Sequence, residues 1–293
     1  MLANPEKQTE IIHYEKSPSG FSIMWREFRK DKLAMFSLVF LTLLLLGVYI
    51  TSFVMKQEDI VRVDLFAIYS PPSAEHLLGT DYGGRDIFGQ LIIGTRNSFT
   101  IGLVITAITC FIGMTIGLIA GYFGGKIDNM IMRIIDFIIV LPFLMIVIVF
   151  ITIVPKFNVL TFILIMSMFL WTGKARLIRS KVLAEKELDY VSASKTLGTP
   201  NWKIITFQVL PNLSSIIIVS VTLNLAGNIG IESGLTFLRF GLPESTPSLG
   251  TLVSYATNPD VCKRNGGFGY CINHDFSVDV EYKFYWPSAT TCS

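Results

Sequence analysis

The sequence contains little of what an enzyme would need. Only 16% of its 293 residues are charged, and it holds three histidines and four cysteines. The pattern GxxxxGK[ST], whose backbone and lysine bind nucleotide phosphates, does not occur, so the chain itself is not expected to bind ATP. No Ser/His/Asp set is placed like that of a hydrolase, and no group of side chains has the spacing of a metal site. We therefore expect no catalytic residues, no cofactor and no metal.

The cysteines do not indicate a disulfide framework. Cys110 lies in an apolar run, where a free thiol usually packs as a small hydrophobe. Cys262, Cys271 and Cys292 lie near the C-terminus with a spacing that matches no zinc motif. Three is also an odd number for disulfide pairing.

Apolar residues, in contrast, are abundant. Hydrophobic residues make up 51% of the chain and its mean hydropathy is +0.56, which is more apolar than is usual for a soluble domain. This excess is expected to face lipid. The formal net charge is only +2, which gives no reason to expect a nucleic-acid partner.

Five apolar runs have the length of membrane-spanning helices, which need about 20 residues each. The first run follows a polar N-terminal stretch, so it is expected to stay in the protein as an anchor and not to be a cleaved signal. The five predicted spans are residues 33–55, 97–125, 130–154, 157–173 and 204–231.

Positive charge is concentrated in alternate loops between these spans, most densely in residues 174–203. Because basic loops stay on the cytoplasmic side, this loop and the N-terminus are predicted to be cytoplasmic. The chain then divides into a cytoplasmic N-terminal segment, a first span, an external segment, a core of four spans and an atypical tail. These parts are residues 1–32, 33–55, 56–96, 97–260 and 261–293.

Few polar residues interrupt the spans. Arg133 and Asp136, three residues apart, are expected to pair at the headgroup boundary, and Glu232 is expected to lie near the external end of its span. Pro142 is expected to kink the third span. No ionisable residue is apparent in the middle of a span, which argues against an ion-driven secondary transporter.

Residues 189–212 form the most distinctive stretch, DYVSASKTLGTPNWKIITFQVLPN. Its first half predicts a short amphipathic helix that Gly198 ends, and Pro200 helps to turn the chain back toward the membrane. Small residues around Ala193 would let another surface approach closely. Composition alone leaves open a loop that only connects two spans.

This stretch resembles the EAA loop of ABC importer permeases, in which EAA is followed by three residues, a glycine, nine more residues and I-x-L-P. The residues that fall on this pattern are Ala193, Gly198, Leu210 and Pro211. The peptide branch of the family carries the version YVxAAxxLG…LPN, which Tyr190 and Asn212 also match. The departures from the general pattern are Ser192 for Glu, Ser194 for Ala and Gln208 for Ile.

Two further segments resemble the same family. Residues 76–98 resemble HxLGTDxxGRDxxxxxxxGxRxS, and residues 232–250 resemble ESxLSFLGLGxxxPxPSWG. The candidate external residues are Gly79, Thr80, Asp81, Gly84, Arg85, Asp86 and Arg96. Their charges either contact an external protein or only fix the shape of a self-packed loop, and an exposed ion pair there would contribute about 0–1 kcal/mol.

The resemblance implies an all-α polytopic membrane protein with the fold of a type I ABC importer transmembrane domain, in the cell membrane. It implies the second permease subunit of an oligopeptide or dipeptide system. Its partners would be another permease in a heterodimer, two cytoplasmic ATP-binding subunits, an extracellular peptide-binding protein and the peptide. The residues implied in coupling to the ATP-binding subunit are Tyr190, Ala193, Ser194, Gly198, Leu210 and Pro211.

The choice of substrate rests on this likeness, because pore-lining residues cannot be identified in a single sequence. A permease for nickel or another small solute has the same architecture and stays open as an alternative. An ion-driven transporter and a membrane-embedded enzyme are the alternatives from other classes.

The tail, residues 261–293, lacks the sixth apolar span that the family carries. Codons for Gly266, Gly267, Phe268 and Gly269 can spell Trp-Trp-Val-Trp in a shifted frame, and the family has a similar Trp-rich stretch at this point. We therefore hypothesise a frame-shifted sixth span, with a genuinely divergent tail as the alternative. The DNA sequence of the gene would decide between them.

Overall fold

The computed structural model describes residues 29–55, 57–154, 158–243 and 246–257. The hypothesis of a frame-shifted sixth span concerns residues outside these ranges. The described residues are mostly helical, and their only extended pairing is an isolated bridge between Thr80 and Asp86. The predicted all-α fold is therefore confirmed.

Four helices are long and apolar enough to cross a membrane, and a bent pair adds a fifth if it counts as one span. The four are α2 (Lys32–Val54), α4 (Ile87–Phe123), the continuous run of α7 (Val159–Leu170) with α8 (Thr172–Glu185), and α12 (Ser214–Phe237). The pair is α5 (Gly125–Val140) with α6 (Phe143–Ile153). The expectation of five spans agrees with this count for the described part of the chain.

The third span is broken at Pro142, where α5 and α6 meet at 80°. Proline cannot donate a backbone hydrogen bond and pushes the preceding residue out of the helical region. Leu141 and Pro142 are accordingly both extended, and α6 restarts with Ile146 N–H donating to the Pro142 carbonyl at 3.2 Å. The kink expected from the sequence is thus a complete interruption of the helix.

Two helices, α4 and α12, begin far from the predicted start of their span. α4 begins at Ile87 instead of residue 97, because the Asp86 carboxylate accepts from the N–H of Gly89 at 2.7 Å and caps the helix there. The last span begins at Ser214 instead of residue 204, after a short π-helical segment η1 (Ile205–Val209) and α11 (Leu210–Asn212). Pro211 lacks an N–H, and the wider π turn before it accommodates the interrupted bonding pattern.

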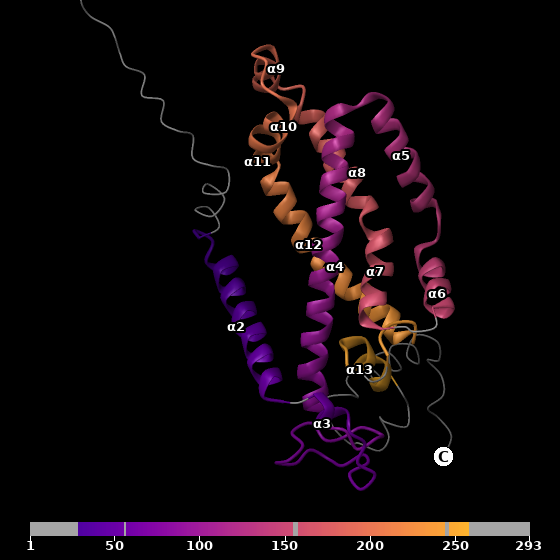
Figure 1. The fold of residues 1–293 in the computed structure, drawn as a ribbon. Helices are drawn as coiled ribbons and strands as arrows, with labels where there is room; N and C mark the ends of the chain where they lie inside the picture. Colours follow the sequence, from indigo (N-terminus) through magenta and orange to yellow (C-terminus); the bar gives the residue numbers. More distant parts are fainter. Residues whose placement is uncertain (1–28, 56, 155–157, 244–245, 258–293) are drawn as a thin grey trace, which may run out of the picture.

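The bundle is built around α4, which packs against α2, α7, α8 and α12 (Figure 1). Its closest neighbour is α8, because α4 presents glycines one turn apart to it. A Cβ added at Gly113, Gly117 or Gly121 would press against α8 at 2.6–2.8 Å. Small residues of this kind let two helical backbones approach closely within a membrane.

The chain runs back and forth between two ends of the bundle (Figure 1). One end, here the α9 end, carries α9 (Asp189–Thr196), α10 (Asn201–Ile204) and the turn between α4 and α5. The opposite end, here the α13 end, carries α3 (Gln57–Val61), the loop that follows it and α13 (Leu249–Ala256). Each end has its own buried apolar cluster, one around Phe162 and Leu235 and the other around Val182 and Val191.

Candidate functional site

The short helix α9 is fixed to the bundle by one apolar side chain. Val191 is fully buried and packs in the cluster that contains Tyr122, Val182 and Ile204. Burial of a valine side chain stabilises this contact by about 1.5–3 kcal/mol. The distinctive stretch is therefore anchored at a defined place on the bundle.

A polar cluster, here the Tyr190 knot, joins the start of α9 to the helices on both sides of it. It consists of Glu185 at the end of α8, Tyr190 in α9 and Asn212 in α11. Asn212 Nδ2 donates to Glu185 Oε1 at 2.9 Å and to the Tyr190 hydroxyl oxygen at 2.8 Å, while the Tyr190 hydroxyl donates to Glu185. Burial and the neighbouring Glu185 carboxylate raise the pKa of Tyr190, so the phenol stays neutral at physiological pH.

Two more side-chain contacts tie the returning chain to the same place. Gln208 Nε2 donates to Ser194 Oγ at 2.8 Å, and the Tyr122 hydroxyl at the end of α4 donates to Asn201 Oδ1 at 3.0 Å. The Lys195 ammonium lies 5.2 Å from the centre of the Tyr122 ring, a cation–π contact. α9 and the chain that follows it are thus bonded directly to α4, α8, η1 and α11.

Gly198 ends α9 in a left-handed conformation, with φ at +75°. Its N–H donates to the Lys195 carbonyl and that of Thr199 donates to the Ser194 carbonyl, at 3.0 and 3.1 Å. This is the Schellman arrangement in which glycine is preferred. No atom lies within 4 Å of where a Cβ would be, so Gly198 is needed for its backbone angles and not for close packing.

The six predicted coupling residues occupy different positions around this element. Ala193, Gly198 and Pro211 are exposed, Ser194 and Leu210 are half-buried, and Tyr190 is exposed at 38% although its hydroxyl bonds inward. The most exposed apolar side chain of α9's end is Leu197 at 84%, followed in the next segment by Trp202 at 58%. The exposed apolar surface of Leu197 and Trp202 was not predicted from the sequence. The contact of Glu185 with Tyr190 and Asn212 was not predicted either.

At the α13 end, the signature residues form a closed network around Asp81. Its Oδ1 accepts from the backbone N–H groups of Gly83 and Arg85, at 2.8 and 3.0 Å. Its Oδ2 accepts from Gln90 at 3.1 Å and lies 3.0 Å from Arg85 Nε. Asp81 and Arg85 are 5% and 9% exposed, so they form the local ion pair expected from the sequence, and it is buried.

Arg85 also joins α13 to the loop that follows α3. Its guanidinium carbon lies 5.0 Å from the ring centre of Tyr82 and 5.9 Å from that of Tyr255, whose own rings meet edge to face. Burial alone would lower the pKa of Arg85, but Asp81, Tyr82 and Tyr255 together raise it. The Arg85 side chain therefore stays charged and holds together two segments that are far apart in the sequence.

Backbone geometry explains why this loop needs glycine. Gly79 and Gly84 have φ values of +76° and +72°. A Cβ at Gly84 would overlap the carbonyl oxygen of Asp64, and one at Gly79 would lie 2.6 Å from that of Ser70. Because of this close approach and the left-handed backbone, a residue other than glycine would be destabilising at either position. The loop is self-packed, as one of the two sequence hypotheses held.

The remaining signature residues stabilise the loop's connection to α4. Thr80 Oγ1 accepts from the N–H of Ser70 at 2.8 Å, and Asp86, besides capping α4, lies 3.3 Å from His76 Nδ1. Arg96 Nη2 donates to Asn97 Oδ1 at 3.1 Å. The structure therefore gives every one of these residues a structural role, and a role in contacting a partner stays a prediction.

Ionisable side chains are buried inside the bundle, contrary to expectation. Lys174, expected in the cytoplasmic loop, is 5% exposed, and its Nζ donates to Thr109 Oγ1 at 2.7 Å and to the Leu170 carbonyl at 3.2 Å. Glu232 is fully buried and accepts from Thr236 at 3.0 Å. Both are bonded to neighbouring groups of the bundle, which is the usual condition for a polar residue at such a position.

The expected pairing of Arg133 with Asp136 is also wrong among the described residues. Asp136 instead lies 2.5 Å from Arg176, across the gap between α5 and α8. A second pair on the same two helices joins Asp128 and Arg179, with Arg179 Nη2 donating to Asp128 Oδ2 at 2.6 Å. Opposite charges on the two helices thus fasten α5 to α8.

The described ranges contain no group of three or more His, Cys, Asp or Glu side chains that could hold a metal ion. Two regions therefore qualify as functional sites: the α9 element with its Tyr190 knot, and the structured loop at the α13 end. They lie at opposite ends of α4 (Figure 1).

Comparison with known proteins bears on both regions. Residues 113–272 match the family described as "Binding-protein-dependent transport system inner membrane component", and residues 19–72 match "N-terminal TM domain of oligopeptide transport permease C". An oligopeptide transport system permease protein, OppC, of Lactococcus lactis subsp. cremoris is 51% identical over 235 residues, 80% of each chain. A dipeptide transport system permease protein, DppC, of Bacillus subtilis is 38% identical, over 86% of this chain and 79% of its own.

Proposed function

The chain belongs to the family of inner membrane components of binding-protein-dependent transport systems, and we propose that it forms part of an ATP-driven import path for oligopeptides or dipeptides. As a member of this family it is a multi-pass membrane permease subunit of an ABC importer. The names of its relatives, one for oligopeptides and one for dipeptides, support a peptide as its cargo.

One observation supports the proposed mechanism: the start of α9, here its base, is bonded to the bundle, whereas its end, here its tip, is exposed. Val191 and the Tyr190 knot hold the base, while Leu197 at the tip is 84% exposed. Trp202, in the segment that follows, is 58% exposed and adds to the apolar surface that a partner could cover. In the proposed function a cytoplasmic ATP-binding subunit covers this tip and moves it, and the contacts at the base pass that movement to α4, α8 and α12.

The partners in this proposal are a second permease subunit, two ATP-binding subunits and an extracellular peptide-binding protein. ATP hydrolysis takes place on the ATP-binding subunits, and this chain contributes no catalytic group. The α9 end is then cytoplasmic and the α13 end external. The basic residues of the 174–203 loop support this orientation.

The buried Lys174 and Glu232 do not favour an ion-driven transporter. Each is bonded to hydroxyl groups of its own bundle, as structural polar residues in membrane helices are. A small-solute importer of the same architecture is distinguished from a peptide importer by the cargo itself. Uptake of a labelled tetrapeptide and of Ni²⁺ into proteoliposomes that contain the whole transporter would separate the two.

The docking of α9 can be tested by cysteine crosslinking in that transporter. We expect a Leu197→Cys variant to crosslink to an ATP-binding subunit, with a yield that changes when ATP is added. Leu160, near the start of α7 at the α13 end, is 66% exposed and provides a matched control as Leu160→Cys. Crosslinks from position 160 and none from position 197 would contradict both the docking and the orientation.

A further inference from the structure

The backbone of Arg239 has a conformation that glycine normally occupies. Arg239 follows α12 with φ at +64°. Its N–H donates to the Thr236 carbonyl, and the N–H of Phe240 donates to the Leu235 carbonyl, both at 2.9 Å, which closes the helix in a Schellman motif. The pattern ESxLSFLGLG has glycine at this position. The chain thus keeps an arginine where glycine would relieve backbone strain, and strain of this kind is typical of functional positions.

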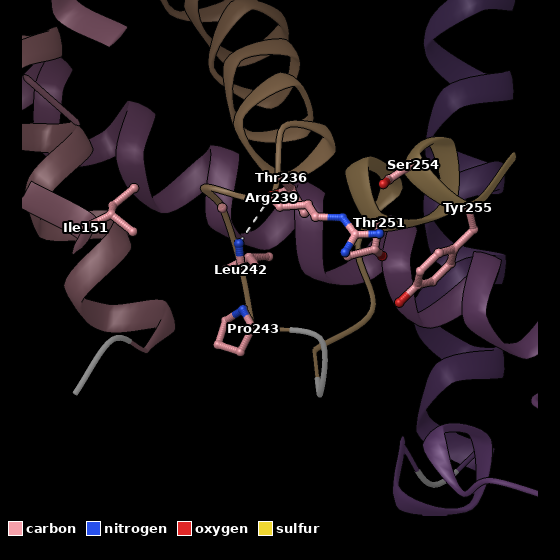
Figure 2. Close-up of a pocket in the computed structure, with 9 residues that line it drawn as sticks. Ile151, Thr236, Arg239, Leu242, Pro243, Thr251, Ser254 and Tyr255 are labelled. Atoms are coloured by element: carbon pink, nitrogen blue, oxygen red, sulfur yellow. Dashed lines mark hydrogen bonds between the residues drawn. The ribbon is translucent and has the colours of Figure 1, made fainter. Parts of the chain in front are cut away.

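The Arg239 side chain extends into a pocket of about 330 Å³ between the end of α12, α6 and α13. Figure 2 shows it reaching from the loop after α12 toward Thr251, with Ser254 and Tyr255 on the adjoining face of α13. Leu242 and Ile151 provide apolar walls. The pocket therefore combines one guanidinium with hydroxyl groups and an apolar rim, which is a common composition for a small polar-group binding site.

The charge of Arg239 is not matched within the described part of the chain. No acidic side chain there forms an ion pair with it, whereas Arg85 at the same end is paired with Asp81. A guanidinium binds a carboxylate through two parallel hydrogen bonds, and neighbouring hydroxyls can add further donors. The shape and charge of the pocket thus fit a single carboxylate-bearing side chain.

We propose that this pocket receives an aspartate or glutamate side chain of the extracellular peptide-binding protein when that protein docks. The inference rests on the proposed function, which makes the α13 end external. The pocket lies at that end, beside the loop that Arg85 clamps to α13. A guanidinium that is unpaired within the described ranges, beside hydroxyl groups at the external end, suits a carboxylate of a protein that docks there, and the cargo's terminal carboxylate is the alternative that the test separates.

The test measures binding of the purified peptide-binding protein to the complete transporter in lipid nanodiscs. We expect Arg239→Gly to weaken binding by about 10-fold or more and to flatten its salt dependence, because a desolvated charge pair is lost. This variant should fold normally, since glycine suits the backbone. Arg62 is an exposed arginine of the same end, so Arg62→Gln is the control for the general loss of positive charge and should change the affinity by about 2-fold at most.

Equal effects of Arg239→Gly and Arg62→Gln would overturn the proposal. Rescue of an Arg239→Glu transporter by one Asp→Arg or Glu→Arg variant of the binding protein would confirm it. A tetrapeptide with a free C-terminus that binds the transporter alone, where its amide does not, and that loses this binding in Arg239→Gly, would show that the pocket takes cargo and would overturn it. Peptide uptake by the wild-type transporter is measured in parallel: without it the proposed function fails, and with it a negative Arg239 result refutes only this inference.

Discussion

Tyr190 and Asn212, the first and last residues of the loop pattern, are hydrogen-bonded to each other at 2.8 Å. They are 22 residues apart in the sequence and meet at Glu185, which belongs to neither end of the pattern. The spacing of the pattern thus has a physical reason: it brings the chain back from α9 to the place where α8 ends.

Removing the Tyr190 knot should loosen the connection between α9 and the spans. Tyr190→Phe deletes only the hydroxyl, and Asn212→Ala deletes both donor contacts. We expect each to lower the free energy of unfolding by about 1 kcal/mol and to reduce the amount of peptide imported per ATP hydrolysed. Thr206→Val, which loses only a bond to its own helix, is the control. An unchanged ratio of uptake to hydrolysis in Asn212→Ala would show that the knot transmits nothing.

The raised pKa of Tyr190 makes the knot sensitive to alkaline pH. Burial, together with Glu185, raises the pKa of the folded phenol above its usual value of about 10. The stabilisation is therefore fully present below about pH 10 and is lost as the pH rises through the folded pKa. A titration of phenolate absorbance in wild type minus Tyr190→Phe should show one tyrosine that ionises late. An early ionisation would contradict this assignment.

Gly198→Asp should uncouple transport while leaving membrane insertion intact. A left-handed backbone costs a non-glycine residue about 1–2 kcal/mol, but the space around Gly198 is open, so the fold should survive. The added carboxylate would lie at the tip that we propose to be covered by the ATP-binding subunit. Gly198→Asn, which tolerates the same backbone without charge, should retain most uptake. Normal uptake by the Asp variant would count against docking through this tip.

Gly84→Ala should destabilise the loop at the α13 end. The new methyl group would overlap the Asp64 carbonyl oxygen in a backbone conformation that alanine disfavours. We expect a loss of about 2–4 kcal/mol in the free energy of unfolding, visible as a lower melting temperature in detergent. Gly227→Ala in α12, where no atom lies within 4 Å of the new group, should be neutral or slightly stabilising. Equal melting temperatures for the two variants would refute the close approach.

The buried Lys174 should tolerate replacement better than the loss of its partner. Lys174→Met keeps a similar side-chain shape and removes the buried charge, which otherwise requires a hydrogen-bond partner. We therefore expect little loss of stability. Thr109→Val leaves the Lys174 ammonium without its 2.7 Å partner and should cost about 1–3 kcal/mol. The double variant should resemble Lys174→Met. A reversed order of the two single variants would show that the Leu170 carbonyl alone satisfies the ammonium.

Hydropathy was sufficient to predict the five spans of the described ranges, with the bent pair α5 and α6 counted as one, because lipid exposure is a property of whole helices. It was insufficient for their ends, which depend on single residues. The Asp86 cap starts α4 ten residues before the predicted span, and the π turn before Pro211 moves the start of α12 to Ser214. Capping and bulging are local bonding events that an averaged apolar score does not detect.

The residue pattern of the loop predicted its short helix and the glycine that ends it. The contacts of its residues could not be predicted, because each depends on a partner brought close by the fold. Asp136 pairs with Arg176, 40 residues away, instead of with Arg133 three residues away. Arg85 is buried because Tyr255, from the far end of the core, lies beside it. Such pairings require the arrangement of helices first.

α4 is long enough to connect the two ends of the molecule as one continuous helix. With 37 residues it extends about 55 Å, from its Asp86 cap beside the external loop to Tyr122, which bonds to Asn201 next to α9. A rod of that length turns a tilt of about 5° into a displacement of about 5 Å at its tip. A small rotation at one membrane surface is thereby magnified at the other.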